Sequence, residues 1–156
     1  MKVWKMNDQE FAAVLGLPPE RRYEYFIKRV ADWRQIWGLR GTGGWAIAGA
    51  QDEQIVFPVW PHPRFAQACV AAHWSGTTPH SISLVEWYNE WVEDMEADSW
   101  VVGVFPDPDL KGVVVNPRKL AEDLLDEISK YEDYDSFLQK ITFYIRYCER
   151  CKSADK

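Results

Sequence analysis

The sequence predicts an α+β fold in one domain, residues 1–156, and two observations lead to this prediction. The first is that strand, turn, strand and helix follow one another twice in the same order. The second is that both units begin at a tryptophan and enter their helix just after a proline. Consecutive strands joined by short turns pair antiparallel, so we expect an antiparallel sheet of four or five strands with N- and C-terminal helices packed on it.

The first unit spans residues 45–73. Its apolar runs and turn residues predict two strands, a turn and a helix. The boundaries of these elements are 45–48 and 55–60 for the strands, 49–54 for the turn and about 64–73 for the helix. Pro61 and Pro63 restrict the residue before each of them to extended conformations, so Trp60 and His62 are held away from helical geometry.

The second unit spans residues 100–130 and has no histidine. It contains two apolar runs, at 100–105 and 112–115, which predict strands. Asn116 is expected to cap the helix that follows, with Pro117 at its first position. The repeated passage through a proline indicates that this corner needs no special chemistry.

Helices are predicted before, between and after the two units. Asn7 and Ser83 each precede a glutamate by three residues, the spacing of a capping box at a helix start. The apolar residues recur three and four apart in each predicted helix, which is the period of one helix face. These helices are expected to begin near Asn7, at Pro18-Pro19 and at Ser83, and the last to run over 136–148 from about Ser136.

The helix expected over 83–95 is strongly amphipathic. Its apolar stripe is broad, and its carboxylates are expected on the opposite side and just beyond its end. We take the acidic residues as a candidate binding surface: Glu86, Glu90, Glu93, Asp94 and Asp98. A solvated helix face explains the same pattern and stays open as an alternative.

The net charge of −6 is unevenly distributed along the chain. Residues 65–135 hold fifteen acidic and four basic residues, a balance of −11, whereas the segments on either side are slightly basic. An acidic centre argues against nucleic acid or an anionic membrane as a partner. It favours a basic protein partner, such as a toxin or an enzyme.

The chain is expected to be cytoplasmic. No apolar segment of a signal peptide follows the first residues, and no run approaches the length of a membrane span. Three cysteines do not form a disulfide framework, which fits a reducing compartment. The lone Cys148-x-x-Cys151 falls at a predicted helix end, where the helix dipole disfavours a reactive thiolate.

Several segments carry a family resemblance. They are Trp37-Gly38-Leu39, Gly44-Trp45, the run from Phe57 to Pro63 with Phe65-Ala66, Val102 to Pro106, Gly112 to Val115 with Pro117, and Leu120-Ala121. Together they resemble the bacterial domain of unknown function 2750 family over about residues 8–126. The helix from Asp133 onward, over about 133–156, looks like an addition. The resemblance implies a small cytoplasmic bacterial protein and implies no activity.

His62 is the one candidate for catalysis. A histidine between two prolines is well oriented for a general base or a ligand, with Trp60 beside it as a pocket wall. No nearby serine, cysteine or aspartate completes a catalytic set, and a turn-stabilising histidine explains the residue equally. A zinc site would need the convergence of His62, Cys69, His73 and His80, at spacings unlike a zinc finger. We therefore expect no metal site and no cofactor.

The sequence thus predicts a non-enzymatic protein that binds a protein partner. The sharper hypothesis is an immunity or inhibitor protein whose acidic residues neutralise a basic toxin or enzyme, with aromatic residues as anchors. The alternative is a small-molecule-binding protein or an enzyme with a pocket around His62 and Trp60. The sequence predicts no oligomeric state.

Overall fold

A computed structural model describes residues 3–49 and 54–154, and the side chains of residues 150–154 lie outside the described part. The expected turn at 49–54 therefore falls mostly outside it. The helices are α1 (Asp8–Leu15), α2 (Pro19–Trp33), α3 (Pro63–Gln67), α4 (Val70–His73), α5 (Leu84–Glu86), η1 (Trp87–Trp91), α6 (Val92–Ala97), α7 (Pro117–Ile128), α8 (Tyr134–Lys140) and α9 (Thr142–Ala154). The strands are β1 (Gln35–Gly41), β2 (Gly44–Trp45), β3 (Ala48–Gly49), β4 (Ile55–Val59), β5 (Thr78–Ser83), β6 (Val101–Val104) and β7 (Val113–Val115).

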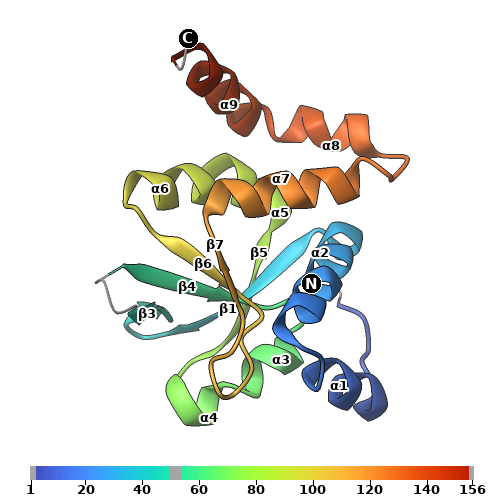
Figure 1. Cartoon of the computed structure of the whole chain (residues 1–156), viewed down its shortest axis with the longest axis vertical. Helices are drawn as coiled ribbons and strands as arrows, with labels where there is room; N and C mark the ends of the chain where they lie inside the picture. Colours follow the sequence, from blue (N-terminus) through green and yellow to red (C-terminus); the bar gives the residue numbers. More distant parts are fainter. Residues whose placement is uncertain (1–2, 50–53, 155–156) are drawn as a thin grey trace.

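The strands form two sheets between two groups of helices (Figure 1). At one end lie α1, α3 and α4. At the other end, α6 and α7 lie next to the sheets, with α8 and α9 beyond α7. None of the helices in the described residues has the length and hydrophobicity that a membrane crossing needs.

The α+β class is confirmed, but the sheet differs from the expected one. The first sheet has the order β2-β1-β5 and is antiparallel, and the second has the order β3-β4-β6-β7. Within the second sheet β4 and β6 are parallel, with Phe57 opposite Val102. The expectation of one antiparallel sheet was wrong because the chain between β4 and β6 is a long crossover, and such a connection allows parallel pairing.

Strands β1 and β5 are absent from the sequence prediction. The three- and four-residue apolar spacing of the helix predicted from Pro18-Pro19 includes both Trp33 and Trp37, yet α2 ends at Trp33 because Arg34 takes a left-handed conformation, with φ of 59°. Residues 78–83, where the sequence analysis predicts no strand and only a helix start at Ser83, pair along their length with β1. These two segments form strands because they pair with each other across a long sequence separation. Such pairing cannot be predicted from local propensity.

Trp37 and Trp60 join the two sheets. The backbone N–H of each donates to the carbonyl oxygen of the other, over 2.9 and 2.8 Å. The side chain of Trp60 is fully buried, and its Nε1–H donates to the carbonyl oxygen of Pro106 over 3.0 Å. Trp60 is therefore part of the core at the junction of the sheets.

The expected helix caps are present. The side chains of Asn7, Ser83 and Asn116 accept hydrogen bonds from backbone N–H groups in the first turns of α1, α5 and α7. The helix predicted for residues 64–73 is divided into α3 and α4, and the helix predicted for 83–95 is a continuous α5–η1–α6 helix with a π-helical turn in its centre.

Candidate functional site

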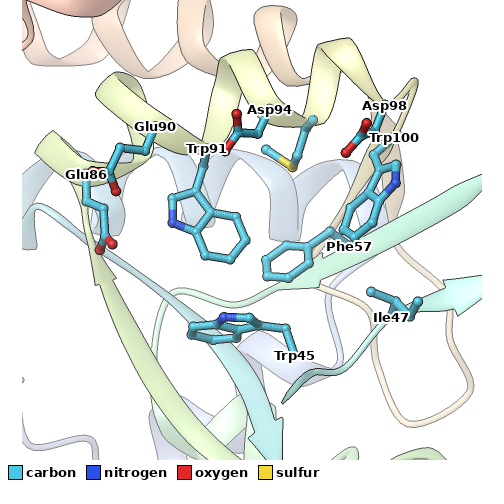
Figure 2. A pocket seen from close by; sticks show the side chains of 10 residues that line it. Trp45, Ile47, Phe57, Glu86, Glu90, Trp91, Asp94, Asp98 and Trp100 are labelled. Atoms are coloured by element: carbon cyan, nitrogen blue, oxygen red, sulfur yellow. The ribbon is translucent and has the colours of Figure 1, made fainter. Parts of the chain in front are cut away.

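A pocket of about 490 Å³ lies between the α5–η1–α6 helix and strands β2 and β4 (Figure 2). We call it the acidic aromatic pocket. Its volume is within the range of ligand sites in proteins. The pocket is lined by Trp45, Ile47, Phe57, Glu86, Glu90, Trp91, Asp94, Met95, Asp98 and Trp100.

Four rings form one side of this pocket, which we call the aromatic floor: Trp45, Phe57, Trp91 and Trp100. The ring of Phe57 lies 5.9 Å from Trp45, 5.0 Å from Trp91 and 6.5 Å from Trp100 between centroids. The rings of Trp45 and Trp91 meet edge to face. Trp45 and Phe57 come from strands β2 and β4, Trp91 from the π-helical turn, and Trp100 from the residue just before β6, so residues far apart in the sequence form the floor.

Gly38 in β1 makes room for the floor. A Cβ atom at this position would lie 3.0 and 3.1 Å from two ring carbons of Trp45, and 3.6 Å from Phe57. The contacts with Trp45 would be rare in their shortness, whereas the distance to Phe57 is an ordinary van der Waals contact, so the ring of Trp45 keeps its place because residue 38 has no side chain. Within the segment Trp37-Gly38-Leu39, the glycine therefore contributes to the pocket by leaving space for a ring of the floor.

The carboxylates of Glu86, Glu90, Asp94 and Asp98 form the other side of the pocket, which we call the acidic line. Figure 2 shows them following the helix along one side of the cavity, with Trp91 on the same helix and with Trp45 and Phe57 across the cavity. In an α-helix, side chains four apart drift round the axis by about 40° at each step. The π-helical turn, in which the N–H of Val92 donates to the carbonyl oxygen of Trp87, is wider and offsets part of this drift.

The carboxylates of the acidic line are without an ion-pair partner within the described side chains. None of the ion pairs found there involves any of the four carboxylates. Glu96 on the same helix is different, because Arg118 binds it through two hydrogen bonds of 3.1 and 3.0 Å. The helix thus has one paired carboxylate, Glu96, outside the pocket lining, whereas the carboxylates of the acidic line that face the pocket form no ion pair. A cation is the ligand that this arrangement favours.

The pocket contains four of the predicted binding residues and omits three. Glu86, Glu90, Asp94 and Asp98 line it, as described above, whereas Glu93 lies on the same helix outside its lining. Neither Trp60 nor His62 lines it, and both are buried. The sequence analysis missed the aromatic floor, although Trp45 and Trp100 had been noted as the first residues of the two units.

His62 caps helix α3. The side chain is 6% exposed, and its Nδ1 accepts a hydrogen bond of 3.1 Å from the backbone N–H of Arg64. Nε2 lies 2.8 Å from the carbonyl oxygen of Trp4, to which it donates in the tautomer that leaves Nδ1 free to accept. Backbone groups thus engage both ring nitrogens, which leaves the proposed general base without a free nitrogen.

Burial lowers the pKa of His62 below its usual value. The hydrogen bond to the Trp4 carbonyl and the charge of Glu10 raise this pKa in part, and the nearby Arg64 and Arg29 lower it further. The neutral imidazole is therefore the form that the fold stabilises. A buried, neutral histidine with both nitrogens bonded fits a structural role.

The four residues considered for zinc do not converge. His62 bonds as described above, Nε2 of His73 lies 2.7 Å from the carbonyl oxygen of Pro108, and Nε2 of His80 lies 3.2 Å from Thr78 Oγ1. The Cys69 thiol donates to the Pro106 carbonyl oxygen over 3.5 Å, and burial raises its pKa to about 11. In the described residues no group of three or more His, Cys, Asp and Glu is arranged to hold a metal ion.

The Cys-x-x-Cys motif lies within α9 and not at its end. Cys148 is a free thiol, and the side chain of Cys151 lies outside the described part. A mid-helix position lacks the helix N-terminus that activates redox thiols.

The residues of the pocket lie within a part of the chain that matches a known protein family. A family model described as "Protein of unknown function (DUF2750)" matches residues 23–124, more than half of the chain. The chain belongs to the DUF2750 family. The family resemblance deduced from the sequence is thereby confirmed over residues 23–124, a shorter range than the expected 8–126. No curated protein was found that matches the sequence.

The DUF2750 region includes every residue that lines the acidic aromatic pocket, since these lie between positions 45 and 100. Helices α1, α8 and α9 lie outside it. The family description names no activity, so the function must be argued from the pocket itself.

Proposed function

We propose that this DUF2750 protein is non-enzymatic, acts in the cytoplasm and binds a basic protein partner through the acidic aromatic pocket. One observation carries the proposal: none of the four carboxylates of the acidic line forms an ion pair among the described side chains, and they share one pocket with the aromatic floor. Carboxylates attract a cation from a distance, and aromatic faces hold it at close range. A pocket with both features suits a positively charged side chain.

The length of the acidic line favours a protein over a single small cation. From Glu86 to Asp98 the helix advances by twelve residues, about 18 Å. All four carboxylates are exposed, so they are accessible to a surface that approaches the helix. A basic protein surface presents several cations over such a distance, whereas a single small cation meets only one or two carboxylates.

An immunity or inhibitor role is the specific form of this proposal. The acidic central segment would steer a basic toxin or enzyme towards the pocket, and binding would cover the basic residues that the partner needs for its own ligand. Binding of this kind weakens as salt screens the charges.

The experiment uses the full chain as bait in a lysate of its native host at low ionic strength. The test variant is E90Q/D94N, and the control E122Q/E132Q removes the same charge at two exposed glutamates outside the pocket. We expect a basic protein to be retained by wild type and control, and to be lost with E90Q/D94N and at high salt. Equal retention by E90Q/D94N, or no basic protein at all, would refute the proposal.

A further inference from the structure

The chain contains its own example of how it holds a cation beside the α5–η1–α6 helix. Arg118 binds both carboxylate oxygens of Glu96 and lies over the ring of Tyr147, 5.5 Å from its centroid. A single guanidinium thus bonds both oxygens of a carboxylate and lies over an aromatic ring. This combination uses the planar shape of arginine.

The acidic aromatic pocket offers the same two kinds of group. Glu90 and Asp94 lie one step apart on the acidic line, about 6 Å along the helix axis, with Trp91 between them in the sequence. A guanidinium has N–H donors along more than one edge, so it can reach two carboxylates while its face lies on an indole ring. An ammonium group is compact and strongly hydrated, and it has no flat face to place on the ring.

The rest of the chain shows the same preference for arginine. Each cation that lies over an aromatic ring in the described residues is an arginine: Arg22, Arg29, Arg34, Arg40, Arg64 and Arg118. Arg40 is the most informative, because it lies 5.4 Å from the ring centroid of Trp45, a residue of the aromatic floor. The lysines that form ion pairs, Lys119 and Lys130, do so with neighbours on or near their own helix.

Resting on the function proposed above, we propose that the pocket receives an arginine side chain of the basic partner in preference to a lysine. The guanidinium lies against the indole of Trp91 and donates to Glu90 and Asp94. Glu86 and Asp98, at the two ends of the acidic line, meet cations on either side of that arginine. The pocket is thus specific for a guanidinium carried by a polypeptide.

The test compares three peptides with the full, unmodified chain by isothermal titration calorimetry at low ionic strength. The peptides are acetylated and amidated, and they differ only at three positions separated by serines, which carry arginine, lysine or citrulline. We expect the arginine peptide to bind about tenfold more tightly than the lysine peptide. Citrulline has the shape of arginine without its charge, so its peptide should show no measurable binding at the same concentrations.

The variant W91L tests the role of the ring. Without the indole, affinities for the arginine and lysine peptides should come within about twofold of each other. The control F143L removes an exposed ring of α9 outside the pocket and should keep the preference. Circular dichroism verifies that both variants are folded. If a variant does not fold, the comparison of the arginine and lysine peptides on the wild-type protein still tests the inference.

The outcomes separate this inference from the proposed function. Equal affinity for arginine and lysine peptides, with loss of both in E90Q/D94N, overturns the preference for arginine and leaves a basic partner in place. Spermine, a diffusible polyamine, overturns the inference if it binds as tightly as the arginine peptide and displaces it. Failure of the arginine peptide to bind overturns the inference too, whereas the proposed function fails only if the lysate experiment also fails.

Discussion

The indole rings of Trp45 and Trp91 meet edge to face, with centroids 5.4 Å apart and planes at 88°. Trp45 ends the edge strand β2, and Trp91 ends the π-helical turn η1. This contact therefore ties the first sheet to the helix that carries the acidic line. The pocket depends on both elements keeping their places.

Substitution of Gly38 by alanine should displace the ring of Trp45, which forms part of the aromatic floor. The new Cβ atom would press on the ring of Trp45, whose opposite shift is limited by Trp91. We expect a loss of about 1–3 kcal/mol in the free energy of unfolding, as for other overpacked sites. Urea denaturation measures this loss, and binding of the arginine peptide should weaken as well. The control G43A adds its Cβ atom where no atom lies within 4 Å, and it should change neither quantity.

Glu90 and Glu93 lie on the same helix and should respond differently to the loss of their charge. Glu90 lines the pocket and Glu93 does not. E90Q should weaken binding of the arginine peptide about twofold to fivefold, the range expected for one exposed ion pair. E93Q changes the net charge equally and should leave the affinity within error. Equal effects of the two variants in calorimetric titrations would mean that net charge alone determines binding.

The acidic line should lower the stability of the unbound protein. Its members follow each other at intervals of four, and like charges at this spacing destabilise a helix by about 0.2–0.5 kcal/mol per pair. E90Q/D94N should therefore raise the free energy of unfolding by up to about 1 kcal/mol. Urea denaturation at low and at high salt measures this gain, which should shrink as salt screens the charges. E122Q/E132Q should give no such gain, and a gain of equal size would indicate a general effect of net charge.

The sequence predicted the acidic side of the site because its pattern is local. Carboxylates recurring every four residues behind a Ser83 cap indicate one helix face without knowledge of the fold. Glu93 was predicted with these carboxylates but lies outside the pocket lining, because an idealised helix does not show where the pocket ends. The π-helical turn, which improves the alignment of the four carboxylates, has no comparable signal in the sequence.

The aromatic floor could not be predicted, because it depends on pairing between distant segments. Trp45 reaches the pocket through β2 and its neighbour β1, and β1 is absent from the sequence prediction. Phe57 and Trp100 come together through the parallel pairing of β4 with β6. Neither pairing follows from local propensity, so the sequence alone does not predict that these tryptophans lie together in one pocket.

His62 and Asn116 occupy equivalent positions in the two units, each just before the proline that opens a helix. Both side chains accept a backbone N–H bond at the helix start, so His62 has the role that asparagine has in the second unit. H62A should reduce the free energy of unfolding by about 1–2 kcal/mol. H62N should recover part of this loss, because its Oδ1 can replace Nδ1 as an acceptor. Thermal and urea denaturation measure the loss in H62A and the recovery in H62N. Binding of the arginine peptide should be the same in both variants as in wild type.

The lowered pKa of His62 predicts a loss of stability in acid. Protonation places a hydrogen on Nδ1, which then faces the N–H of Arg64 and can no longer accept its bond. Because the folded-state pKa lies below the value of about 6.5 in the unfolded chain, this contribution is complete above pH 6.5 and is lost as the pH falls through the folded-state pKa. The stability difference between wild type and H62N should therefore shrink from pH 7.5 to pH 5 in urea titrations. A difference that is constant or grows over this range would show that the folded state does not favour the neutral imidazole.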